Sequence, residues 1–117
     1  KTITISQLEG EALLLISKNS FMYRLCTDLC RAANFLPKVV FTSQRAENLV
    51  ELIEQGTGIA LLMPKPVIPI LPDNLTVVDI EPRVTTTVFV AWLKNRKFNT
   101  ACKRFLELVQ TVPFEEV

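Results

Sequence analysis

Histidine is absent from this 117-residue chain, and glycine and cysteine are scarce, with three of each. Without histidine, the chain cannot build Ser-His-Asp or Cys-His catalytic groups, His-ligated metal sites or the usual proton carrier near neutral pH. An excess of one charge is also lacking, because 13 basic and 12 acidic residues leave a net charge of +1. A nucleic-acid surface needs a larger positive excess. We therefore expect no catalytic centre, no metal, no cofactor and no dedicated nucleic-acid surface.

Long apolar runs are missing as well. The longest, Ala12–Ile16 and Ile59–Pro64, are far shorter than a membrane span. Three cysteines cannot all pair, so a secreted disulfide framework is not indicated, and we expect a reducing, cytoplasmic environment. The chain begins at Lys1 without a signal-like segment, which favours a portion of a longer protein. With 49% hydrophobic and 21% charged residues, the composition is that of a globular domain.

Strand and helix signals alternate in the first half of the chain. Ala12–Ile16 is a continuous apolar run of strand length, typical of a strand that is covered on both faces. A helical apolar stripe follows from Met22 to Ala33, and Ser20 is placed to cap its N terminus. Asn34 suits the left-handed residue that ends such a helix.

The same order is then repeated. Lys38–Thr42 reads as a second strand, Ser43 as the cap of a second helix that ends at Gly56, and Ile59–Met63 as a third buried strand. Short strand–helix–strand connections require right-handed crossovers between parallel strands. The predicted fold class is therefore α/β, with a parallel βαβαβ core and added strands.

The second half reads differently. Pro64–Pro72 contains four prolines and has room for one short helical turn. Leu75–Ile80 and Thr86–Leu93 are predicted to be two further strands, and Asn99 or Thr100 to cap a last amphipathic helix.

Ligands of open parallel sheets bind beyond the carboxyl ends of the strands, beside helix N termini. In this chain those places are Lys18–Phe21, Thr42–Arg45 and Met63–Lys65. Hydroxyl groups beside unpaired backbone N–H groups favour a carboxylate, sulfate or phosphate, and nearby cations add attraction. Ser20 and Ser43 also fit the role of ordinary helix caps, which is compatible with ligand contact.

Cysteine, tryptophan and charged residues have simpler interpretations. Cys26 and Cys30 lie on one apolar helix face, so we interpret them as packing residues rather than a metal or redox pair. Trp92 is likewise assigned to the core. The basic cluster around Lys94–Lys97 and the glutamates of the second helix are interpreted as solvated surfaces.

Three segments, Ile5–Gly10, Asn48–Pro64 and Val88–Lys94, follow the order of a known family. Asn48–Pro64 combines a helix, a paired-glycine turn, an apolar strand and a closing proline. This order resembles the effector-binding domains of LysR-type transcriptional regulators, over nearly the whole chain. Type 2 periplasmic solute-binding proteins share the architecture.

The resemblance implies one lobe of a type 2 periplasmic-binding-protein-like fold. Lobe two would span about residues 10–82, and the return strand and helix of lobe one about residues 86–112. It implies a small anionic effector, a homo-oligomer, no membrane, and DNA binding only through an N-terminal helix-turn-helix that this chain lacks. The implied effector contacts are Lys18, Asn19, Ser20, Thr42, Ser43, Met63 and Pro64.

The leading hypothesis is therefore the ligand-sensing domain of a LysR-type regulator, without enzymatic activity. The alternative is a lobe of a solute-binding protein that serves a transporter; a signal peptide encoded upstream would support it. A phosphate-handling enzyme is the third hypothesis, but Gly56-Thr-Gly58 precedes a strand rather than a helix.

Overall fold

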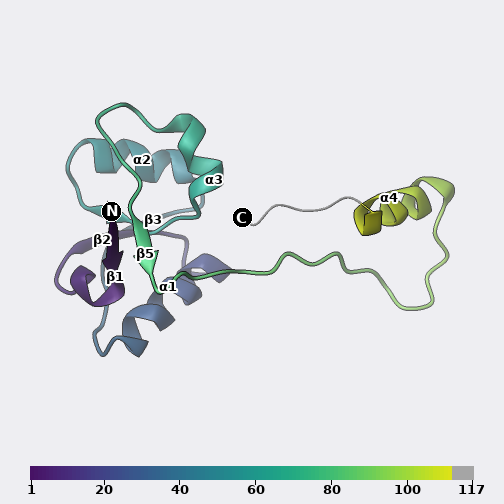
Figure 1. Cartoon of the computed structure of the whole chain (residues 1–117), viewed down its shortest axis with the longest axis horizontal. Helices are drawn as coiled ribbons and strands as arrows, with labels where there is room; N and C mark the ends of the chain where they lie inside the picture. The colour runs from purple at the N-terminus through teal and green to yellow at the C-terminus, as the bar shows by residue number, and fades with distance from the viewer. Residues whose placement is uncertain (112–117) are drawn as a thin grey trace. The chain divides into compact units, whose positions relative to one another are not determined.

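The computed structural model describes residues 1–111 and separates into two compact units, residues 1–84 and residues 85 onward. The first unit contains a parallel sheet of three strands in the order β3–β2–β4 (Figure 1). These strands are β2 (Ala12–Ile16), β3 (Lys38–Ser43) and β4 (Ile59–Ala60). The predicted parallel βαβαβ core is confirmed.

Strand β2 occupies the centre of the sheet, since it pairs with β3 along one edge and with β4 along the other, and both of its faces are covered by helices. Helix α1 (Phe21–Ala32) connects β2 to β3 on one side, and helix α2 (Ala46–Glu54) connects β3 to β4 on the other. Right-handed crossovers that run in opposite directions place their helices on opposite faces of a sheet. Figure 1 shows α1 and α2 on either side of the strands. The continuous apolar sequence of β2 follows from this double coverage.

The two faces of β2 contribute to separate parts of the core. Leu13 and Leu15 pack in one cluster with Cys26 and Cys30 of α1. The same cluster contains Ile5, Leu8, Phe35 and Leu61. Leu14 points to the opposite face, as strand alternation requires, and α2 contributes the buried Leu49 and Val50. The interpretation of the two cysteines as packing residues is confirmed.

The third strand is shorter than predicted. Ile59–Met63 was expected to be extended, but only Ile59 and Ala60 form the ladder, with Leu61 N donating to Leu14 O at 3.4 Å. Pro64 lacks an N–H and starts the short helix α3 (Pro64–Val67), which ends the pairing. A 3₁₀ turn, η2 (Ile68–Ile70), follows and confirms the short helical segment among the prolines.

A second, two-stranded parallel sheet joins distant parts of the first unit. Strand β1 (Thr2–Thr4) pairs with β5 (Asp79–Glu81), and the 3₁₀ turn η1 (Ile5–Leu8) follows β1. The predicted strand Leu75–Ile80 is therefore wrong in its extent. Pairing is possible only where β1 provides a partner, so β5 is three residues long and begins at Asp79.

The second unit contains helix α4 (Thr100–Thr111), and its predicted cap is confirmed because Cys102 N donates to Asn99 Oδ1 at 2.8 Å. Residue 112, the expected end of this portion, lies outside the described residues. Residues 86–93 form no strand, contrary to prediction, because no described strand pairs with them. Trp92 was assigned to the core, but it is 54% exposed and forms an edge-to-face contact with Phe98, at 6.3 Å between ring centroids.

Candidate ligand-binding site

The order of the strands determines where loops converge. The two connections cross the sheet in opposite directions, because α1 leads from β2 to β3 and α2 leads from β3 back past β2 to β4. In a parallel sheet such a reversal opens a crevice beyond the carboxyl ends of the strands. The loops that follow β2, β3 and β4 therefore share one edge of the sheet, and all seven predicted contact residues lie in or next to them.

The loop after β2 leads directly into α1. Lys18 and Asn19 form an exposed turn, closed by the Ser20 N–H bond to Ser17 O at 2.9 Å. Ser20 is the N-cap, and its Oγ accepts from Tyr23 N at 3.0 Å. Because the first turn of α1 contains no acidic residue, the partial positive charge of this helix end is not neutralised there.

The last residue of β3 is held against the loop after β2 by a hydrogen bond from Ser17 N to Ser43 O at 3.0 Å. The prediction that Ser43 caps α2 is wrong, because the N-cap is Arg45 and no side chain caps this end. Ser43 lies two residues before the cap. Its Oγ accepts from Arg45 N at 3.1 Å and from Asn48 Nδ2 at 3.0 Å.

Asn48 is a polar site residue that the sequence did not single out. It belongs to the first turn of α2, so its side chain reaches back to Ser43 across five residues. The sequence signal that was available was a polar residue in the first turn after a hydroxyl residue, a common arrangement for local side-chain bonds.

Thr42 and Ser43 do not share one face. Thr42 pairs with Leu15 and Ser43 with Ile16, so the two side chains alternate across the sheet. Thr42 lies on the face covered by α1, whereas Ser43 lies on the face covered by α2. The structure therefore brings both residues to one edge but separates their hydroxyl groups.

The two basic side chains at this edge, Lys18 and Arg45, differ in whether an acidic side chain lies close to them. Lys18 is exposed and forms no ion pair within residues 1–111, whereas Arg45 Nε lies 3.7 Å from Glu47 Oε2. Glu47 also lies in the first turn of α2, where it offsets the positive helix end. The start of α1 is therefore the more electropositive part of the site.

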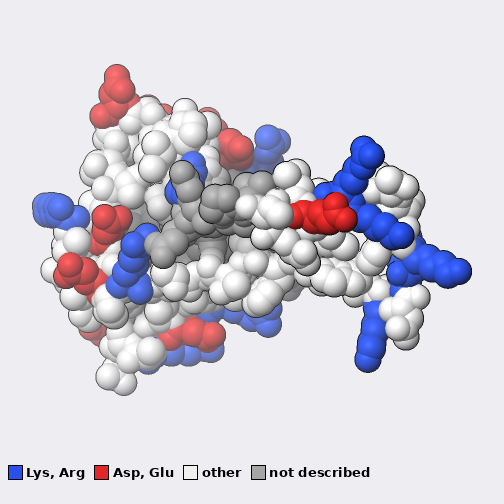
Figure 2. Space-filling model, turned by 45° about the vertical axis from the view of Figure 1, so that its right-hand side comes forward, with Lys and Arg blue, Asp and Glu red and all other residues white. Residues whose placement is uncertain are grey.

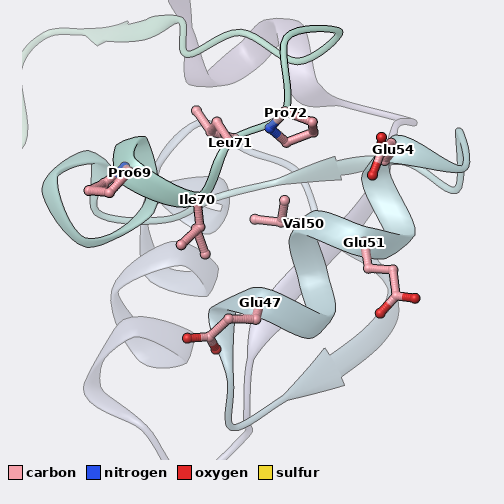
Figure 3. A pocket seen from close by; sticks show the side chains of 8 residues that line it. All are labelled: Glu47, Val50, Glu51, Glu54, Pro69, Ile70, Leu71 and Pro72. Carbon is pink, nitrogen blue, oxygen red and sulfur yellow. The ribbon is translucent and has the colours of Figure 1, made fainter.

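The loop after β4 offers few hydrogen-bond donors to a ligand. Met63 is half-buried and precedes Pro64, which has no backbone N–H. Helix α3 contains only four residues and therefore adds little dipole. A cavity of about 300 Å³ lies between α2 and residues 69–72, and no predicted contact residue lines it (Figure 3).

Parallel strands joined by helices on both faces define the first unit as an α/β domain. The chain belongs to the LysR substrate binding domain family, whose model matches residues 1–113. This confirms the resemblance stated from the sequence, and the family is one of periplasmic-binding-protein-like α/β domains in transcriptional regulators, not of enzymes.

Among curated proteins, the chain is similar to an uncharacterized HTH-type transcriptional regulator, YybE, of Bacillus subtilis (strain 168). The two are 23% identical over 117 residues, an alignment that covers 93% of this chain and 37% of the relative. The chain therefore spans little more than a third of that protein. No solved structure matches the chain. Within residues 1–111, no helix combines the length and apolar character needed to cross a membrane.

Proposed function

We propose that this chain is the ligand-sensing portion of a LysR-type transcriptional regulator that binds a small anionic effector. Membership of the LysR substrate binding domain family and the similarity to an HTH-type transcriptional regulator support the proposal. Residues 10–82 act as lobe two, and residues 86–112, which include helix α4, belong to lobe one. DNA is contacted by a helix-turn-helix outside this sequence, and the regulator acts in the cytoplasm as a homo-oligomer.

The hydrogen bonding of Ser43 carries the proposal of an anionic effector. A hydroxyl group has two acceptor lone pairs and one donor. Both lone pairs of Ser43 Oγ accept bonds, from Arg45 N and from Asn48 Nδ2. The remaining group is the O–H donor, so a ligand that contacts Ser43 must supply an acceptor. Lys18 and the uncompensated start of α1 add positive potential at the same edge.

The mechanism is a shift between two arrangements of the oligomer. An effector changes this equilibrium only as far as it binds one arrangement better than the other. The Ser17–Ser43 hydrogen bond holds the end of β3 against the residue that follows β2, so the loops after the two strands leave the sheet side by side. If the effector binds one arrangement about 1.4 kcal/mol more tightly than the other, the ratio of the two arrangements changes about tenfold. One hydrogen bond to a charged group contributes on the order of this energy.

Sulfate binding to the 117-residue chain tests the site. The Ser43→Ala chain should bind sulfate roughly ten- to hundredfold more weakly, since a hydrogen bond to a charged group contributes about 1.5–3 kcal/mol. Thr76→Ala is the matched control, because Thr76 is an exposed hydroxyl residue away from the strand ends. Equal sulfate affinity of the Ser43→Ala and wild-type chains, with both folded, would remove Ser43 from the site.

The remaining alternative, a lobe of a solute-binding protein, is decided by the coding sequence upstream of Lys1. A helix-turn-helix encoded there supports the regulator. A signal peptide directly before the domain would refute it.

A further inference from the structure

Asn48 is connected to the proposed ligand site through the side chain of Ser43. It lies in the first turn of α2, and its Nδ2 donates to Ser43 Oγ at 3.0 Å across five residues. A second bond to this oxygen comes from the backbone, since Arg45 N donates to it at 3.1 Å. The backbone bond is available whatever side chain residue 45 carries, whereas the bond from Asn48 depends on the identity of one side chain.

The bond from Asn48 decides which group Ser43 can offer to a ligand. A serine hydroxyl rotates, so by itself it can either donate to a ligand or accept from one. With both lone pairs of Ser43 Oγ occupied, the O–H proton is the group that is left. A ligand that approached with an N–H or O–H group would find no acceptor there, and an unpaired polar group weakens binding.

We propose that Asn48 is a positioning residue that sets the ligand preference of this site by holding Ser43 as a donor. It acts through Ser43 and does not itself contact the ligand. The inference rests on the proposed function, because it assigns a source of selectivity to the same site. The consequence is a preference for acceptor groups, such as the oxygens of a carboxylate or a sulfate, over ligands that present donors.

Charge and hydrogen-bond direction are supplied by different residues of the site. Lys18 and the start of α1 attract any anion. Figure 2 shows basic side chains next to acidic ones on the face in view, so attraction by charge alone does not select one kind of ligand. Asn48 is uncharged and leaves that attraction unchanged, while it determines which group Ser43 presents.

A double-mutant cycle on sulfate binding to the 117-residue chain, measured by calorimetry, tests this role. Asn48→Ala should weaken sulfate binding about threefold, because a hydroxyl that is no longer held has about three staggered orientations. In the Ser43→Ala chain the same substitution should change sulfate affinity no further. Alanine is the best helix former, so α2 is retained. Equal losses in the two backgrounds would show that Asn48 does not act through Ser43 and would overturn the proposal.

Asn48→Asp provides the opposite case at pH 7. The carboxylate has nearly the shape of the amide but only accepts hydrogen bonds, so it takes the Ser43 proton away from the ligand. It also repels an anion. Sulfate affinity should fall at least about tenfold, and the fall should be smaller in the Ser43→Ala chain, where only repulsion remains. The same fall in both backgrounds would assign the whole effect to charge and would overturn the proposal.

Gln55→Ala is the matched control, because Gln55 carries an exposed amide at the other end of α2. It should bind sulfate like the wild type. A readout without ligand is the NMR signal of the Asn48 side-chain amide, which should shift in the Ser43→Ala chain while that of Gln55 does not. An Asn48 signal that stays unchanged would refute the bond on which the proposal depends.

The same measurements separate this proposal from the ligand site. Saturable sulfate binding by the wild type, with equal effects of Asn48→Ala in both backgrounds, would reject the role of Asn48 alone. A wild-type chain without saturable sulfate binding would reject the ligand site itself, and the ligand preference with it.

Discussion

Replacing Gly58 by alanine is expected to disrupt the attachment of β4 to the central strand. A Cβ atom at this position would overlap the carbonyl oxygen of Ala12 and lie 2.8 Å from Leu14 Cδ1 and 3.1 Å from the carbonyl carbon of Ala12. Because two of these three atoms belong to the backbone of buried β2, they cannot move aside as a flexible side chain does. Overpacking in a core costs about 1–3 kcal/mol, and contact with backbone places this substitution near 3 kcal/mol.

Thermal unfolding followed by circular dichroism measures the effect. A loss of about 3 kcal/mol corresponds to a fall in Tm of roughly 12–24 °C for a unit of this size. Gly56→Ala is the matched control, because Gly56 has φ +81° but nothing within 4 Å of an added Cβ. It should lose only about 1–2 kcal/mol, from left-handed backbone strain.

Substitution by asparagine further distinguishes steric overlap at Gly58 from left-handed backbone strain at Gly56. It tolerates the left-handed conformation, so Gly56→Asn should recover part of the loss, whereas Gly58→Asn should be at least as unstable as Gly58→Ala. If Gly58→Ala unfolds at the wild-type temperature, β4 does not lie as close to β2 as described, and the three-stranded sheet would be refuted.

Further predictions concern the helix caps and the cysteines. Ser20→Ala should destabilise the first unit by about 1 kcal/mol through loss of the part-buried bond from Tyr23 N–H. Ser43→Ala should cost less, because the two bonds that its hydroxyl accepts are exposed; a larger loss for Ser43→Ala than for Ser20→Ala in urea unfolding would contradict this assignment. Burial, with a smaller contribution from the neighbouring Cys30, raises the pKa of Cys26 from its ordinary 9.0 to about 11, and burial also raises the pKa of Cys30. The unfolded chain therefore releases these protons first, and the free energy of unfolding should fall as pH rises from 9.0 towards 11. The Cys26→Ala/Cys30→Ala chain should lack this part of the slope; an unchanged slope would contradict burial of the thiols.

Local sequence patterns were sufficient to predict the elements whose stabilising contacts lie close by in the sequence. The apolar run of β2, the Ser20 cap and the stripe of α1 all follow from rules that span one helical turn or one strand. The left-handed Asn34, with φ 66°, also ends α1 as predicted. The parallel sheet followed because two successive short crossovers leave few other arrangements.

Elements that depend on distant partners were less predictable. Strand β5 is defined by pairing with β1, which lies more than 70 residues earlier, and no local pattern specifies that register. The run from Thr86 to Leu93 has strong strand propensity, but propensity alone does not satisfy backbone hydrogen bonds. Trp92 is exposed for the same reason, since its apolar neighbours have no sheet on which to pack.

The candidate site was predicted better in position than in detail. The seven residues do lie at the strand ends, because that placement follows from topology. The role of Ser43 depended on where α2 begins, and a shift of two residues changed it from a cap to an acceptor of the Asn48 amide. Helix boundaries are decided by packing as well as by cap residues, so this detail required coordinates.

Residue-resolved NMR of the 117-residue chain during a sulfate titration, with chloride at equal ionic strength as the reference, tests the ligand site most directly. We predict that the amide signals of Ser20–Met22 and Ser43–Ala46 shift together along one saturable binding curve. Shifts that are confined to other surfaces, or that grow linearly without saturation, would contradict a shared anion site at the ends of the parallel strands.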